Sequence, residues 1–199
     1  MEDEYGHEKL IKMVTNLNIS IDSLCEILRA LSKDRNKYAR SGVASNPNIP
    51  EECACEILGR LSKDEEEVIR WEVAKNPNIP EECACEILNR LSKDEDGDIR
   101  SEAAHNPNIP SECACEIFDR LSKDKNRFVR FRVSDSLNIP FECACEIFDR
   151  LSRDEEGVIR WEVAKNLSIP EECACDIYNR LKDEFPVAVF INPAFANCK

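Results

Sequence analysis

The chain is poor in glycine and histidine, and it contains no long apolar run. It has 5 glycines and 2 histidines among 199 residues, which argues against a turn-rich β protein. No stretch approaches the roughly 18 apolar residues of a membrane helix. The first residues, MEDEYGHEKL, lack the apolar core of a secretory signal. We therefore predict a protein without a membrane partner, located in the cytoplasm, where thiols stay reduced.

Motifs of catalysis are also missing. The sequence has no nucleophile elbow, no phosphate-binding loop, no cluster of metal ligands and no recurring histidine. We therefore predict a protein that is not an enzyme and that needs no cofactor or metal.

Basic charge is in deficit. The formal net charge is -13 and the isoelectric point is about 4.7. An acidic field of this size repels phosphate groups, so unspecific binding to nucleic acids or anionic membranes is disfavoured. The apolar fraction of 42% is enough for burial to drive folding.

The sequence instead contains an internal repeat with a period of 30 residues. One pentapeptide recurs without a slip, as NLNIS at 16–20, NPNIP at 46–50, 76–80 and 106–110, SLNIP at 136–140, and NLSIP at 166–170. The tetrapeptide ECAC recurs at the same spacing from residue 52. A fixed period of this size is typical of repeat proteins in which each unit is one structural module.

The residue pattern within each unit predicts two helices. Helix A covers about residues 51–62, where Pro50 precedes an apolar pattern of helical spacing. Helix B covers about residues 66–75, with Asp64 expected as its N-cap and Asn76 expected in the left-handed conformation after its last turn. Helices this short are unstable alone, so each must pack on the next unit. We predict an all-α solenoid of about six repeats.

The predicted array spans residues 1–182, with units starting near residues 16, 46, 76, 106, 136 and 166. Residues 7–15 (HEKLIKMVT) align with helix B and predict an N-terminal half-repeat. The pattern stops after Leu181, and residues 183–199 are expected to form a C-terminal capping tail. An alternative is that the apolar stretch 187–191 forms a strand or a peptide lying in a groove.

The repeat resembles the leucine-rich repeat variant family. The resemblance lies in Val68-Ile69-Arg70, Val73-Ala74 and Asn76-Pro77-Asn78-Ile79-Pro80, followed by Leu91 and Asp94, and it covers about residues 16–182. It implies a right-handed superhelix of alternating helices. The unit is longer than the family's, by about one turn in helix A, and this moves the expected structure toward HEAT-like helix pairs. The N-terminal iron–sulfur module of some relatives is not carried over, because only Cys25 precedes residue 53.

Comparison of the units separates positions that stay constant from positions that vary. In helix B, one column of residues is always arginine, represented by Arg70, and another column in the preceding loop is always aspartate, represented by Asp64. We interpret the arginines as a structural ladder that pairs with the aspartates or with carbonyl groups at helix ends. Four other columns vary at spacing i, i+3, i+4 and i+7, so they share one side of helix B.

This variable face is the predicted binding surface for a protein or peptide. It carries both tryptophans together with other aromatic and charged residues, which is the composition of interaction surfaces. The candidate residues are Tyr38, Val68, Trp71, Glu72, Lys75, His105, Phe128, Phe131, Arg132, Trp161 and Lys165. The alternatives are that the face is only solvated, or that its rings pack under neighbouring helices A.

Two other functions are open at this point. Basic and aromatic residues alternate over residues 123–132, with a weaker copy around Tyr38, and could bind an acidic peptide or a nucleic-acid strand. The 12 cysteines could bind metal or sense oxidants. Cys53 and Cys55, however, point to nearly opposite sides of a helix, and column partners such as Cys55 and Cys85 are expected too far apart to bridge. We therefore interpret the cysteines as small core residues, with Cys198 as a free thiol.

Overall fold

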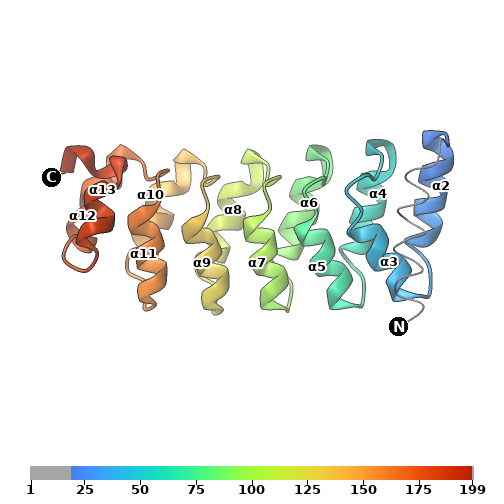
Figure 1. Ribbon diagram of the computed structural model, residues 1–199, viewed down its shortest axis with the longest axis horizontal. Coiled ribbons are helices and arrows are strands. Elements are labelled where there is room, and N and C mark those ends of the chain that lie inside the picture. Colours follow the sequence, from blue (N-terminus) through green and yellow to red (C-terminus); the bar gives the residue numbers. More distant parts are fainter. Residues whose placement is uncertain (1–18, 199) are drawn as a thin grey trace. The chain divides into compact units, whose positions relative to one another are not determined.

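The computed structural model describes residues 19–198, and the described residues form two compact units that divide after Pro110. All regular elements of both units are helices (Figure 1). The first unit contains α2 (Ile21–Leu31), α3 (Lys37–Ala44), α4 (Glu51–Leu61), α5 (Glu67–Lys75), α6 (Glu81–Leu91) and α7 (Gly97–His105). The second contains α8 (Ser111–Leu121), α9 (Arg127–Asp135), α10 (Phe141–Leu151), α11 (Gly157–Lys165), α12 (Glu171–Leu181), α13 (Pro186–Ile191) and the 3₁₀ helix η1 (Pro193–Cys198).

Within each unit, helices A pack on helices A and helices B pack on helices B. In the first unit α2, α4 and α6 form one layer, and α3, α5 and α7 form the other. In the second unit α8, α10 and α12 form one layer, while α9, α11 and α13 form the other. This stacking of two-helix repeats is the arrangement of an α-solenoid, so the predicted fold class is confirmed. The right-handed sense, the single array over residues 1–182 and the boundary of the tail stay predictions.

The sequence pattern explains where each helix lies. Pro50 is the N-cap of α4, and Ala54, Ile57, Leu58 and Leu61 on one side of this helix are buried. Helix B starts one residue later than expected, and the predicted cap is wrong. Asp64 does not cap α5, whose N-cap residue is Glu66. The Asp64 carboxylate instead accepts a hydrogen bond from the Glu66 amide and faces an arginine of the preceding repeat.

Arginine–aspartate pairs link consecutive helices B, as the sequence predicted. Arg70 donates from Nε and Nη2 to the two carboxylate oxygens of Asp94, 24 residues on, at 2.7 and 3.0 Å. Its Nη1 donates to the backbone carbonyls of Asp64 and Glu65. Arg40 and Arg130 make the equivalent pairs with Asp64 and Asp154. Each guanidinium therefore joins the loop of its own repeat to the loop of the next.

Asparagines at the end of helix B form a second ladder. Asn76 Nδ2 donates to the carbonyls of Ala44 and Asn46 in the preceding repeat, and Asn106 does the same to Ala74 and Asn76. The expected left-handed conformation of Asn76 is wrong, because its φ and ψ are -65° and 120°. Extended backbone directs the side chain back to the preceding repeat, which a left-handed C-cap would not require.

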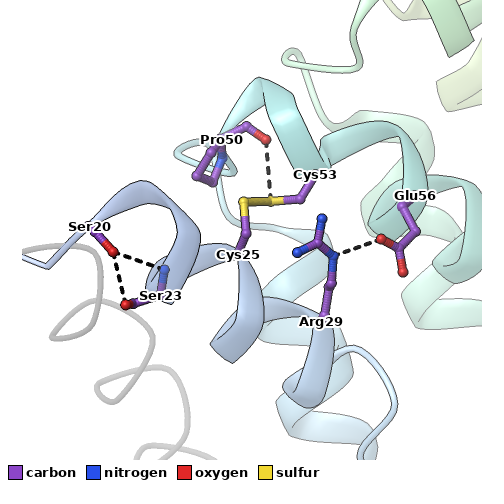
Figure 2. Close-up of a disulfide and its surroundings, with 7 residues drawn as sticks. All are labelled: Ser20, Ser23, Cys25, Arg29, Pro50, Cys53 and Glu56. Carbon is purple, nitrogen blue, oxygen red and sulfur yellow. Dashed lines mark hydrogen bonds and ion pairs between the residues drawn. A yellow bond between two sulfur atoms is a disulfide. The ribbon is translucent and has the colours of Figure 1, made fainter.

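Disulfides link consecutive helices A, which contradicts the interpretation of the cysteines as core residues. Cys25 and Cys53 are bonded with their Cα atoms 5.9 Å apart (Figure 2). Further disulfides within the units are Cys55–Cys83, Cys115–Cys143, Cys145–Cys173 and Cys175–Cys198. The described residues contain no free cysteine. The prediction of Cys198 as a free thiol is therefore wrong, and the reduced thiols behind the cytoplasmic prediction are not found.

The reason is that the cysteines bonded between consecutive helices A are 28 residues apart, not 30. Cys175 and Cys198, in α12 and the tail, are 23 residues apart. Two cysteines separated by one residue point to opposite sides of their helix. In α4, Cys53 therefore faces the preceding helix A and Cys55 faces the following one. A comparison of cysteines within one column does not reveal this diagonal pairing.

The C-terminal tail supplies a shortened helix B for the sixth repeat, whose helix A is α12. Glu184 takes the aspartate position and pairs with Arg160, and α13 takes the place of helix B. Asn192 Nδ2 donates to the carbonyls of Ala164 and Asn166. Phe195 is fully buried. The alternative of a strand at 187–191 is wrong, since these residues belong to a helix.

Two further predictions concern membrane helices and the N-terminal residues. Within residues 19–198, no helix is long and apolar enough to cross a membrane. The predicted half-repeat at 7–15 lies outside the described residues.

Candidate functional site

The candidate site is the variable face of helices B, whose side chains are not part of the arginine and asparagine ladders described above. In the first unit, α5 carries Val68, Trp71, Glu72 and Lys75 on this face. Val68 and Lys75 are exposed, while Trp71 and Glu72 are half-buried. The indole is therefore not enclosed in the core. Tyr38 on α3 and His105 at the end of α7 are exposed positions of the same columns.

Trp71 already has one cationic neighbour. The Lys75 ammonium lies 4.6 Å from the centre of the indole ring, a distance at which the ring quadrupole attracts a cation. Burial raises the pKa of the adjacent Glu72, and the charge of Lys75 opposes that shift. The face therefore presents an aromatic ring flanked by ionic groups.

The second unit carries the more aromatic part of the face. Phe128 on α9 is 58% exposed and Trp161 on α11 is 37% exposed. Phe131 and Arg132 are half-buried, and Lys165 is exposed. The Trp161 indole meets the ring of Phe185 edge-on at 5.5 Å, and the Lys165 ammonium lies 6.0 Å from its centre. Neither unit buries its tryptophan in the seam between repeats.

A hollow opens between α5 and α7 beside Trp71. It encloses about 180 Å³, and its walls are Val68 and Trp71 from α5 and Ile99 from α7. Three carboxylates, those of Glu67, Asp96 and Asp98, complete its lining. We call these six residues the α5–α7 pocket. Its apolar walls and acidic rim suit a ligand with an apolar stem and a positive charge.

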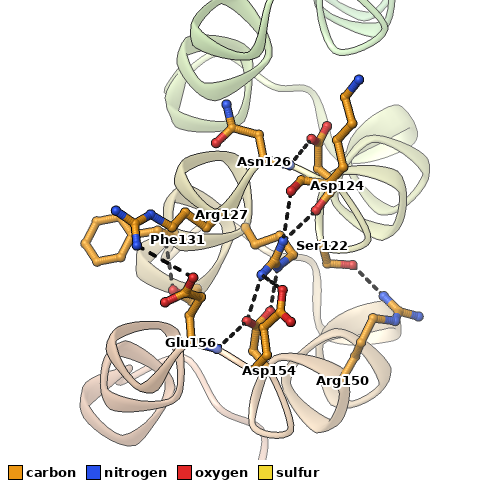
Figure 3. Close-up of polar contacts among 12 residues, drawn as sticks. Ser122, Asp124, Asn126, Arg127, Phe131, Arg150, Asp154 and Glu156 are labelled. Carbon is orange, nitrogen blue, oxygen red and sulfur yellow. Dashed lines mark hydrogen bonds and ion pairs between the residues drawn. The ribbon is translucent and has the colours of Figure 1, made fainter.

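The basic–aromatic segment 123–132 is largely neutralised by its own neighbours. The Lys123 ammonium pairs with Asp119 at 2.8 Å, and Arg130 is held in its ladder by Asp154. Arg127 extends across to Glu156 of the next repeat at 3.6 Å (Figure 3). These pairs leave less positive charge for a phosphate backbone than the sequence suggested.

The cysteines offer no thiolate in this oxidised form, because those of the described chain are disulfide-bonded. Metal ligation by cysteine requires the thiolate. Among residues 19–198, no group of three histidine, cysteine, aspartate or glutamate side chains could hold a metal ion.

Comparison with known proteins bears on the fold alone. The chain is similar to the X-ray structure of YibA from Escherichia coli, with a TM-score of 0.55 and 18% sequence identity over 97% of this chain and 74% of that chain. No family model and no curated protein matches. This similarity supports the fold alone, an α-solenoid of two-helix repeats.

Part of this pocket was not predicted from the sequence. Val68 and Trp71 are among the predicted residues, whereas Glu67 and Asp96, which line the same pocket, are not. A signal was present in the sequence. The column of Glu67 changes charge from repeat to repeat, from Lys37 to Glu67 to Arg127, while the column of Asp96 contains acidic or amide residues only.

Proposed function

We propose that this chain is a non-enzymatic scaffold that binds a protein or peptide through the variable face of its helices B. The observation that carries the proposal is that Trp161 and Phe128 are exposed. The opposite sides of their helices, α11 and α9, are buried against neighbouring helices. Burying such rings at an interface yields more binding energy than most other side chains provide.

The division of labour between the two sides of helix B supports this function. Ile69, Val73 and Ala74 of α5 are buried in the stack, and Arg70 is occupied by Asp94. The variable side takes no part in these contacts. Although Trp161 meets Phe185, the exposed aromatic residues there need another explanation. Repeat solenoids generally use such extended surfaces for binding.

We further propose that the chain is a lengthened relative of the leucine-rich repeat variant family. The residues that carry the resemblance have structural roles that depend on the repeat: Arg70 and Asp94 form a ladder pair, and Asn76 binds the preceding repeat. Pro80 is the N-cap of the next helix A. A shared motif of this kind reflects a shared mode of stacking.

The disulfides favour an oxidising environment for this function. Such bonds persist outside reducing compartments and are rare in the cytosol. We therefore propose that the protein works where its helix-A bridges remain oxidised, rather than in a reducing cytoplasm.

The experiment is capture of a partner from native extract by the immobilised chain. The combined variant Trp71→Ala, Phe131→Ala and Trp161→Ala is expected to lose capture while its helicity by circular dichroism is unchanged. A matched variant replaces exposed helix-A residues, Glu52→Ala, Glu82→Ala and Glu142→Ala, and should retain capture. Equal capture by the aromatic variant and the native chain would refute the proposal.

A further inference from the structure

The positions of Glu67 and Asp96 in the α5–α7 pocket have counterparts at other junctions between repeats, and at two of these junctions one position is a cation. At the α3–α5 junction the Lys37 ammonium lies 3.5 Å from the Glu66 carboxylate. At the α9–α11 junction the Arg127 guanidinium lies 3.6 Å from Glu156. The two basic residues occupy the same column, and the two glutamates occupy the column one residue before it. An ion pair across the junction is therefore a recurrent feature of this repeat.

At the α5–α7 junction the cation is replaced by an acid. Glu67 occupies the column of Lys37 and Arg127, and Asp96 occupies the column of Glu66 and Glu156. Asp98 adds a third carboxylate to the same hollow. Within residues 19–198, no basic side chain forms an ion pair with any of these three carboxylates.

Two basic side chains of α5 are engaged elsewhere. The Arg70 guanidinium pairs with Asp94, although the charge of Asp96 also helps to raise its pKa. The Lys75 ammonium lies over the Trp71 ring and makes no ion pair with Glu67, Asp96 or Asp98 among the described residues. Asp96 uses one oxygen to cap α7, accepting from the Asp98 amide at 2.7 Å. The three carboxylates would therefore gain from a positive charge supplied from outside.

We propose that the α5–α7 pocket binds a lysine or arginine side chain of a protein partner. The aliphatic stem lies against Val68 and Trp71, and the charged head lies among Glu67, Asp96 and Asp98. The intramolecular pairs Lys37–Glu66 and Arg127–Glu156 show the arrangement that the external side chain completes. This inference rests on the proposed function and names the chemistry of the partner, a basic segment that complements a net charge of -13.

The test uses a tetralysine peptide with blocked ends, and the indole N–H signals of the two tryptophans as the readout. Tetralysine should shift the signal of Trp71 and leave that of Trp161 in place, with Trp161→Phe assigning the two. Blocked tetraglutamate should shift neither. A peptide that moves both indole signals alike, or neither, would overturn the proposal.

The decisive variant is Glu67→Lys, which recreates the residue present at position 37. The new lysine should pair with Asp96 and occupy the pocket, and so weaken tetralysine binding at least about tenfold. Glu52→Lys makes the same change of net charge on an exposed site of α4, and it should weaken binding only about twofold through long-range charge. Trp71→Ala changes no charge and should also weaken binding, which calorimetric titration measures because this variant lacks the reporting indole. Equal losses in the two lysine variants would leave only an unspecific attraction and contradict the pocket.

Failure of the pocket proposal can be distinguished from failure of the proposed function. If Glu67→Lys binds tetralysine as Glu52→Lys does, while the triple aromatic variant still loses its partner from extract, the pocket is wrong and the proposed function stands. If the triple variant retains its partner, the proposed function falls, whatever the peptide result. Urea unfolding of each variant checks that the fold is retained.

Discussion

Arg160 pairs with Glu184 in the same bidentate way that Arg130 pairs with Asp154. Its Nε and Nη2 donate to the two carboxylate oxygens at 3.0 and 2.5 Å, again 24 residues ahead. Glu184 lies in the tail, where the motif of the repeat is no longer legible. The pair therefore shows that the tail is joined to the repeat of α10 and α11 in the same way that each repeat is joined to the one before it.

The first prediction concerns the tail. Phe195→Ala should lower the free energy of unfolding by about 3–5 kcal/mol, because the ring is fully buried and leaves a cavity. Val187→Ala on the exposed side of α13 should change stability by less than about 0.5 kcal/mol. Urea unfolding followed by circular dichroism measures both, and a Phe195→Ala variant as stable as the native chain would show that the tail does not cover the last repeat.

A second prediction concerns the arginine ladder. Asp94→Asn should destabilise the protein by about 3 kcal/mol, since it leaves the Arg70 guanidinium enclosed with a weakened partner. Glu95→Gln is the matched control, because the Glu95 side chain is 91% exposed, although it lies 3.7 Å from the same guanidinium. Its effect should stay below about 0.5 kcal/mol. If the two substitutions lower the free energy of unfolding equally, the arginine ladder does not contribute to stability.

The same aspartate predicts a dependence on pH. Burial opposes the charged form of Asp94, but hydrogen bonds from Arg70 and from the Asp96 amide hold its pKa below the ordinary value. A carboxyl whose pKa is lower in the folded state stabilises the protein above its unfolded pKa of about 3.9, and that stability disappears as the pH falls further. Unfolding between pH 6 and pH 2, roughly the span of this titration, should therefore show a smaller acid loss in Asp94→Asn than in the native chain.

A fourth prediction concerns the helix-A disulfides. The oxidised chain should show no free thiol within residues 19–198 when unfolded in guanidinium with a thiol reagent, and reduction should lower its melting temperature. In the chain-entropy model, one bridge that closes a loop of 28 residues stabilises by about 3–4 kcal/mol. The paired variant Cys55→Ser and Cys83→Ser measures one bridge alone. If thiols of the untreated chain react with the reagent, the helix-A disulfides are not formed.

Much of the fold could be predicted because the repeat supplies several copies of each signal. Helix A was expected at 51–62 and is found at Glu51–Leu61, and the pairing of Arg70 with an aspartate column followed from two unbroken columns. Local conformation was harder to predict. Asn76 is typical of a left-handed cap, yet its contact with the repeat 30 residues earlier requires an extended backbone, and no local pattern reports that contact.

The cysteines and the tail were misread for a related reason. A disulfide depends on which sides of two neighbouring helices face each other, so Cys55 finds Cys83 and not its column partner Cys85. In the tail, a shorter helix B shifts Asn192 and Phe195 out of the 30-residue register, although both keep their roles. For the candidate site, variation between repeats predicts one side of helix B as the binding surface, and this stays a prediction. The pocket at Glu67 depends on a neighbouring helix and could not be located by one column alone.

The most direct measurement is amide hydrogen exchange of the chain, free and saturated with the partner captured from extract. The account predicts added protection along α5, α9 and α11, around Trp71, Phe131 and Trp161, with little change in the outer turns of α4, α6, α10 and α12. Protection confined to those helices A, with the helices B unchanged, would contradict the proposed binding face.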